Sequence, residues 1–170
     1  MKLTTITSSL VAALVTGCAS PRIIKPHVPF DAAAAQRQLA DGPNGIKGSA
    51  LIRQNGGGVV TCAGETVFLM PATDAASEWA VAVYGSRSGG FHGAMTRGMT
   101  FEGRSDLFGA VRSATCDAQG SFKFDHVADG TFYVFTRIVW TAGMLQGGSI
   151  MRAVTLSGGQ SVDLVLSPAQ

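Results

Sequence analysis

The chain has 170 residues, of which 46% are hydrophobic and 14% charged, with 22 glycines and a formal net charge of +2. Such a chain can bury one substantial core, and its richness in glycine and β-forming residues favours short strands over a helical bundle. A nearly neutral chain without clustered lysine and arginine lacks the electrostatic footprint of a nucleic-acid-binding protein, so we exclude nucleic acid as a partner.

Residues 1–17 have the pattern of a secretory signal peptide. Lys2 supplies positive charge, residues 10–15 form an apolar stretch too short for a stable membrane span, and small residues precede Cys18. The run Val-Thr-Gly-Cys at 15–18 resembles the lipobox of bacterial lipoproteins, in which Leu and Ala or Ser are more usual at the first two positions. The resemblance implies cleavage before Cys18 and acylation of this cysteine. The alternative is an ordinary signal peptide that happens to contain a cysteine.

An acylated Cys18 would anchor the protein to a membrane, since several acyl chains hold durably where one gives marginal binding. In lipoproteins of this kind the residue after the cysteine helps to determine whether the protein stays in the inner membrane or moves to the outer membrane. Ala19 is not the aspartate associated with retention in the inner membrane. The resemblance therefore implies a lipid-anchored protein of the outer membrane, facing the periplasm or the cell surface.

Residues 18–43 are expected to form a lipidated tether followed by a short helix. Prolines at 21, 26 and 29 should keep residues 19–30 out of any regular element, as an extended linker. Asp31 can cap a helix over residues 32–40, which stops before Asp41-Gly42-Pro43. So short a helix is unstable alone, and we expect it to lean on one end of the domain.

The domain proper begins at residue 44 and consists of strands joined by glycine-rich turns. Residues 46–53 and 65–70 predict the first two strands, with glycines 56–58 between them. This glycine run lacks the following Lys and Ser/Thr of a phosphate-binding loop, so we interpret it as a hairpin loop.

The middle of the chain allows more than one interpretation. Residues 75–83 follow a helix-start pattern with Asp74 as a candidate cap, yet Trp79, Val81 and Val83 alternate as in a strand, and both alternatives stay open. Residues 85–109 hold seven glycines and no clean periodicity. They predict a long excursion that is either a functional loop or disordered.

The clearest pattern runs over residues 115–140. Residues 117–120 predict a tight turn, after which Phe122 and Phe124 alternate with polar residues. Asp129-Gly130 predicts a second turn, followed by a long strand over residues 131–140 with Phe132, Val134, Thr136, Ile138 and Trp140 on one side. Further strands are expected at residues 111–115, 149–156 and 160–166.

Four segments carry a family resemblance: Gly48-Ser-Ala, residues 62–73, Asp-Ala-Gln-Gly-Ser-Phe-Lys-Phe at 117–124 and Asp-Gly-Thr-Phe-Tyr-Val at 129–134. They resemble the carboxypeptidase-regulatory-like domain, a transthyretin-like (prealbumin-like) fold found also in bacterial lipoproteins. The resemblance covers residues 44–168. It implies an all-β, antiparallel sandwich of about seven strands, with a signal-peptide helix and one or two short helices outside it. No active site can be carried over, because the peptidase zinc ligands lie in a different domain.

The polar side chains show no catalytic or metal-binding pattern. His27, His92 and His126 lack metal-ligand spacing, and no Gly-x-Ser-x-Gly sequence is present. A hydrolase would need a Ser or Asp within hydrogen-bond reach of His92 or His126 in a pocket. We therefore expect no enzyme activity, no metal and no cofactor.

Two functions remain open for the domain. The first is a non-catalytic envelope lipoprotein with a structural or protein-interaction role. The second is a glycan- or peptide-binding module that uses residues 85–109 and exposed aromatic side chains. Its candidate ligand-binding residues are Trp79, Tyr84, His92 and Trp140, although aromatic residues in a β domain are more commonly buried. Burial of both tryptophans would favour the first function, and one lying flat in a groove would favour the second.

Cys62 and Cys116 remain once Cys18 is used for lipid, in a compartment where thiols oxidise. Both lie next to strand boundaries, so they can meet at one end of a sandwich. We predict a disulfide between them. The alternative is a pair of separate buried thiols that pack as small hydrophobic groups.

Overall fold

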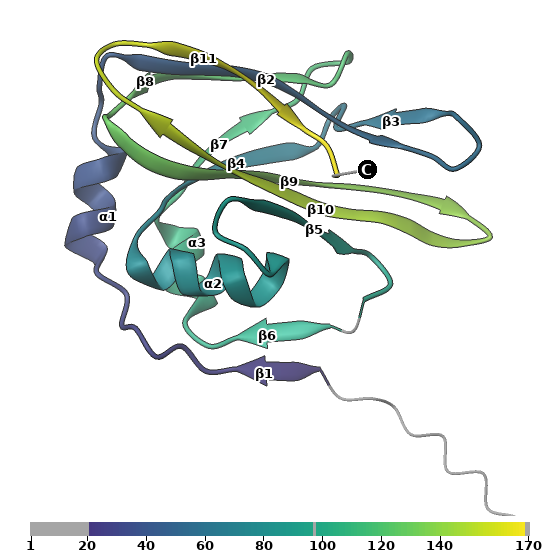
Figure 1. The fold of residues 1–170 in the computed structure, drawn as a ribbon, viewed down its shortest axis with the longest axis horizontal. Helices are drawn as coiled ribbons and strands as arrows, with labels where there is room; N and C mark the ends of the chain where they lie inside the picture. The colour runs from purple at the N-terminus through teal and green to yellow at the C-terminus, as the bar shows by residue number, and fades with distance from the viewer. Residues whose placement is uncertain (1–20, 97, 169–170) are drawn as a thin grey trace, which may run out of the picture.

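The computed structural model describes residues 21–96 and 98–168, which form an all-β sandwich of two packed sheets with short helices outside it (Figure 1). This confirms the predicted fold class. Cys18 and the proposed signal peptide lie outside the described residues. The five-stranded sheet has the order β5 (Gly89–Gly93), β10 (Met144–Leu156), β9 (Gly130–Ala142), β4 (Thr66–Pro71) and β7 (Arg112–Thr115).

The four-stranded sheet is built around β2 (Asn44–Arg53). Its other members are β11 (Ser161–Leu166), β3 (Val59–Thr61) and β8 (Ser121–Val127). The two sheets contain β3 and β5 in addition to the seven strands expected from the sequence. The pairing of β11 with β2 is parallel, whereas the other ladders of the two sheets are antiparallel. The turn after β10 carries the chain from the five-stranded sheet into the four-stranded sheet, where β11 pairs with β2 and forms no hairpin with β10.

The helices and the remaining strands lie outside the sandwich. They are α1 (Ala32–Leu39), α2 (Asp74–Tyr84), α3 (Arg104–Gly109), β1 (Arg22–Ile24) and β6 (Met99–Phe101). In Figure 1, α2, α3, β1 and β6 lie beneath the five-stranded sheet, on the side away from the four-stranded sheet, and α1 stands at one end. The Asp31 carboxylate accepts a hydrogen bond from the Ala34 N–H, as expected for the cap of α1.

The expectation that residues 19–30 form no regular element is wrong for three of them. Residues 22–24 pair in parallel with residues 99–101, as β1 with β6. The pairing is possible because Pro21 and Pro26 flank the paired residues and remove no N–H group from the ladder.

Residues 74–84 are helical, so the strand alternative for this segment is wrong. The Thr73 hydroxyl, rather than Asp74, accepts the capping hydrogen bond from the Ala76 N–H, at 3.3 Å. Residues buried along α2 include Ala76, Trp79 and Ala80, a helical spacing. Val81, which the alternation would have buried, is 45% exposed.

Two hydrophobic clusters lie on opposite faces of the five-stranded sheet. The inner core lies between the sheets and contains Phe122, Phe124, Phe132 and Ile138. The outer core lies between the sheet and α2 with α3, and contains Trp79, Tyr133, Phe135 and Met151. Because β9 buries both of its faces, the predicted alternation over residues 131–140 describes the inner face alone.

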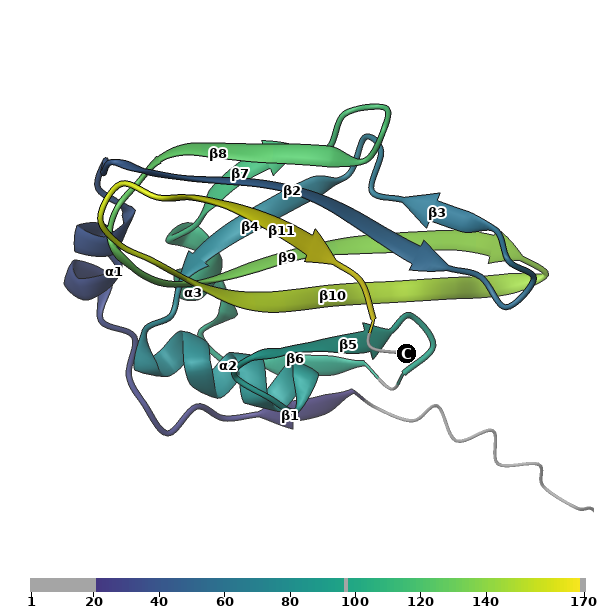
Figure 2. The same cartoon turned by 45° about the horizontal axis from the view of Figure 1, so that its top comes forward.

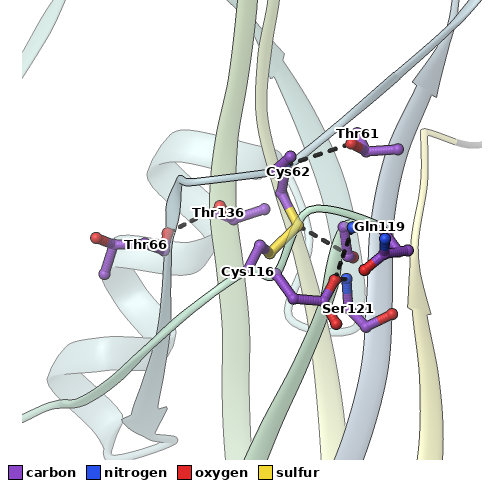
Figure 3. Close-up of a disulfide and its surroundings, with 10 residues drawn as sticks. Thr61, Cys62, Thr66, Cys116, Gln119, Ser121 and Thr136 are labelled. Carbon is purple, nitrogen blue, oxygen red and sulfur yellow. Dashed lines mark hydrogen bonds between the residues drawn. A yellow bond between two sulfur atoms is a disulfide. The ribbon is translucent and has the colours of Figure 1, made fainter.

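The predicted disulfide between Cys62 and Cys116 is present, with 5.8 Å between the Cα atoms (Figure 3). Each cysteine lies where the chain passes between the sheets, Cys62 between β3 and β4 and Cys116 between β7 and β8. The predicted turn follows at once: the Asp117 carboxylate accepts from the N–H groups of Gln119 and Ser121, and Gly120 takes a φ of +81°. The bridge therefore fastens the two sheets together beside this turn.

Candidate functional site

A cavity of about 400 Å³ lies on the outer face of the five-stranded sheet, and this volume is within the range usual for ligand sites, about 300–1,000 Å³. Its walls come from the sheet, from α2, α3, β1 and β6, and from the connection between β5 and β6. Figure 2 shows β1, β6 and α2 on this side of the sheet, next to its edge strand β5. The aromatic, charged and hydrogen-bonding residues that line it include Phe68, Trp79, Tyr84, His92, Arg104, Phe108, Phe135, Arg137 and Ser149.

Aromatic rings form the main wall of the cavity. Trp79 lies 5.1 Å from Phe135, 5.6 Å from Tyr84 and 5.6 Å from Phe108, measured between ring centroids. Phe68 stacks on Phe135 at 5.3 Å. Interlocked rings hold one another in fixed orientations, so this wall is a preformed apolar surface.

A row of polar side chains crosses the sheet next to this wall. Arg137 of β9 lies directly opposite Ser149 of β10, which lies directly opposite His92 of β5. Residues directly opposite one another project from the same face of a sheet. The neighbouring row on this face contains Phe68 and Phe135. Polar and aromatic groups therefore line the cavity side by side.

A hydrogen-bonded chain fixes the centre of the polar row. The Ser149 hydroxyl donates to the Thr136 carbonyl oxygen at 3.2 Å, so the Tyr84 hydroxyl, 2.6 Å away, donates to Ser149. Burial raises the pKa of Tyr84 to about 12, against smaller opposing effects of the Ser149 hydroxyl and the Arg104 charge. Tyr84 is thus a neutral phenol near neutral pH, and its oxygen can accept a hydrogen bond from a ligand.

Two arginines supply the charge of the cavity lining. Arg104 of α3 places its guanidinium carbon 4.6 Å from the centroid of the Phe108 ring, a cation–π contact. Arg137 of β9 lies at one end of the polar row. Both are exposed residues that also line the cavity, which places them where it opens to solvent. Neither forms an ion pair with an acidic residue of the described chain.

Gly90 allows the end of α2 to lie close to the sheet. A Cβ atom at this position would meet the Tyr84 carbonyl oxygen at 2.6 Å and the Tyr84 Cβ at 2.7 Å. Only glycine permits so close an approach without displacing Tyr84. The sequence shows this glycine merely as one of several in the segment 85–109, which the structure folds into β5, β6 and α3.

The structure brings together three of the four candidate ligand-binding residues. Trp79, Tyr84 and His92 line one cavity, as do parts of the segment 85–109. Trp140 does not belong to this site, because it packs against the inner core on the other face of the sheet. Trp79 is only 4% exposed and belongs to the wall itself, without lying flat in an open groove.

Sequence reasoning missed Phe68, Phe108, Phe135, Arg104, Arg137 and Ser149. One signal was available for Arg137, a charged residue inside the apolar run of β9. A charge in a strand that is buried on both faces indicates a polar opening on one of them.

Among the described residues, no Ser or Asp side chain forms a hydrogen bond with His92. Ser149 and His92 are cross-strand neighbours, but the Ser149 hydroxyl bonds to Tyr84 and Thr136. Within residues 21–96 and 98–168, no group of three or more His, Cys, Asp or Glu side chains is placed to hold a metal ion. The helices of this part of the chain are all too short or too polar to cross a membrane.

A scan against protein-family models and a search of curated proteins find no match. Among solved structures, the chain is similar to a protein from Pseudomonas aeruginosa whose crystal structure is described as that of a "putative carbohydrate binding protein". The two share 28% sequence identity with a TM-score of 0.67, over 84% of this chain and 98% of the other. The likeness thus covers nearly all of the second protein.

Proposed function

We propose that this protein is a non-catalytic carbohydrate-binding module of the bacterial envelope, with the cavity on the outer face of the five-stranded sheet as its binding site. The observation that carries the proposal is the pairing of an aromatic wall with a row of hydrogen-bonding groups in one preformed cavity. A sugar presents C–H faces that pack on aromatic rings and hydroxyl groups that need polar partners. The description of the similar Pseudomonas protein supports the same ligand class.

The cavity supplies both kinds of hydrogen-bonding partner for sugar hydroxyls. Arg104 and Arg137 donate, the Tyr84 oxygen accepts, and the His92 ring offers one nitrogen of each kind when neutral. The rings of Phe68 and Phe108, each partly buried, contribute apolar surface next to these groups. Catalysis is not needed for such a site, since a binding module has only to hold its ligand in place.

Blocking the cavity tests the proposed site. Ala94 lines the cavity, so Ala94→Trp should fill it and abolish saccharide binding in isothermal titration calorimetry. Ala118→Trp is the matched control, because Ala118 is exposed in the turn after Cys116 and does not line the cavity. Saccharide binding that survives Ala94→Trp would place the site elsewhere. Binding of peptides alone would favour the peptide-binding alternative.

The placement in the envelope rests on the lipobox-like sequence before Cys18 and on the tether that follows it. We propose that acylated Cys18 anchors the protein in the outer membrane. Cys18→Ser should release the protein from the membrane fraction without changing its thermal unfolding, because the anchor lies outside the domain. An unchanged membrane fraction would contradict the lipid anchor.

A further inference from the structure

We infer that the ligand of the cavity is an acidic saccharide whose carboxylate is held by Arg104 and Arg137. The inference rests on the proposed carbohydrate-binding function and narrows its ligand class. Among the described lining residues, these two arginines are the only ones with a permanent charge, and no Asp or Glu lines the cavity. A neutral sugar requires no such excess of positive charge.

The two guanidinium groups are available to a ligand. Arg104 lies over the Phe108 ring, and this cation–π contact leaves the guanidinium N–H groups free to donate hydrogen bonds. Arg137 stands at the end of the row that continues through Ser149 and His92. A carboxylate can accept two parallel hydrogen bonds from one guanidinium, the strongest form of this contact.

Glu78 and Glu102, which lie on or next to elements that wall the cavity, are engaged with other partners. Glu78 of α2 accepts hydrogen bonds from the His27 and Val28 N–H groups at 2.9 and 3.0 Å and lies 2.6 Å from the His27 ring. A carboxylate oxygen of Glu102, just after β6, lies 3.9 Å from the Lys25 amino nitrogen. Neither carboxylate lines the cavity, so the charge of the two arginines is not neutralised inside it by the described residues.

The composition of the wall favours a carboxylate over a phosphate ester. Taking a charged group out of water is costly, and the cost is larger for a doubly charged group than for a singly charged one. A group held by the arginines at the opening, with the aromatic wall behind it, loses part of its hydration, so a monoanion is accommodated more readily than a dianion. A sugar acid also keeps the C–H face that packs on the aromatic wall.

Matched ligands test the inference. Glucuronate, galacturonate and mannuronate are each titrated into the protein at low salt. For each uronate, the matching neutral hexose, the methyl ester of the uronate and the hexose 6-phosphate are titrated in parallel. At least one uronate should bind about tenfold more tightly than its neutral partners, a difference of about 1.4 kcal/mol. High salt should weaken the uronate complex and leave neutral-sugar binding unchanged.

Variants of the two arginines test whether uronate affinity depends on their charges. Arg104→Met and Arg137→Met should each reduce uronate affinity toward that of the neutral sugar, and Arg137→Lys should restore part of it because lysine keeps the charge without the planar fork. Arg53→Met is the control, since Arg53 is exposed at the end of β2 and does not line the cavity. Thermal melts confirm that each variant is folded.

The possible failures are distinguishable. Neutral hexoses that bind as tightly as uronates, with Ala94→Trp abolishing both, would overturn the acidic ligand and leave the carbohydrate site intact. Tighter binding of 6-phosphates would overturn the carboxylate. Failure of every saccharide, charged or neutral, would overturn the proposed function together with this inference.

Discussion

The two faces of the five-stranded sheet are packed in different ways. The inner face meets the four-stranded sheet in a core of aliphatic and aromatic side chains, and a disulfide holds the two sheets together. The outer face meets α2, α3, β1 and β6, where packing leaves a cavity of about 400 Å³. β9 contributes to both faces, because its residues alternate between the inner and the outer core.

Under the proposed function, the inner face provides stability and the outer face provides the binding site. The inner face is filled by buried side chains, and a void there would cost stability, whereas the cavity on the outer face opens to solvent. On the outer face, the side chains at the opening are arginines and hydrogen-bonding groups. Changes on the inner face should therefore alter stability alone, and changes at the cavity should alter binding.

The largest effect is expected from Phe132→Ala on the inner face. Phe132 is fully buried, and removing its ring should lower the free energy of unfolding by about 3–5 kcal/mol. Phe91→Ala is the matched control, because Phe91 is 40% exposed and its truncation should cost far less. Chemical denaturation measures both. A negligible loss for Phe132→Ala would mean that the inner face is not the stabilising one.

Removal of the disulfide should have the next largest effect. The cysteines are 54 residues apart, and closing a loop of this size restricts the unfolded chain by about 4 kcal/mol in the chain-entropy account. The double variant Cys62→Ala and Cys116→Ala should lose about 2–4 kcal/mol, with saccharide affinity of the folded protein unchanged. Mass analysis of the unreduced wild type should find no free thiol at these two cysteines; two free thiols would contradict the bridge.

Tyr84 should make the outer face sensitive to alkaline pH. Its pKa is raised to about 12 in the folded protein, above the ordinary value near 10, so folding favours the neutral phenol. Stability should be intact below pH 10 and fall as the pH rises toward 12, by roughly 2–3 kcal/mol at about 1.4 kcal/mol per pH unit. Tyr84→Phe lacks this ionisation, so denaturation at pH 9 and pH 12 should show the extra loss in the wild type alone. Equal losses would contradict the burial of this hydroxyl.

The smallest effect is expected at Glu78. Hydrogen bonds from the His27 side chain, then from the His27 and Val28 N–H groups, lower the pKa of Glu78. Because the pKa of Glu78 is lower in the folded protein, its ionised carboxylate adds stability above the unfolded-state pKa, near 4.5. This stability is lost as the pH falls through the folded-state pKa. Glu78→Gln should speed hydrogen exchange at the amides of residues 27 and 28 at neutral pH. Unchanged exchange there would show that this contact does not hold the N-terminal segment to α2.

The sequence was most informative where local chemistry decides the structure. Asp117 and Gly120 predict their turn, Phe122 and Phe124 predict a half-buried strand, and Asp31 predicts the start of α1. The disulfide followed from cysteine counting and strand boundaries. All of these belong to the sandwich or to its edge, where side-chain period and turn residues act on neighbouring positions.

The cavity was harder to predict, because distant segments build it. Arg104, Arg137 and Ser149 come from α3, β9 and β10, and their convergence depends on strand register. The segment 85–109 lacks periodicity because its short elements each pack in a different way. The alternation puts Trp140 on the same side of the strand as Phe132; in the structure this is the inner side, so Trp140 does not reach the cavity. The resemblance to the carboxypeptidase-regulatory-like domain stays a prediction, as does acylation of Cys18.

The most direct test of the division between the two faces is a saccharide titration followed by NMR of isoleucine δ1-methyl groups. Ile24 lines the cavity, whereas Ile46, Ile138 and Ile150 belong to the inner core. A saturating uronate should shift the Ile24 signal and leave the three inner signals in place. Shifts of the inner signals without a shift of Ile24, or no shift with any saccharide of the panel, would contradict a carbohydrate site on the outer face.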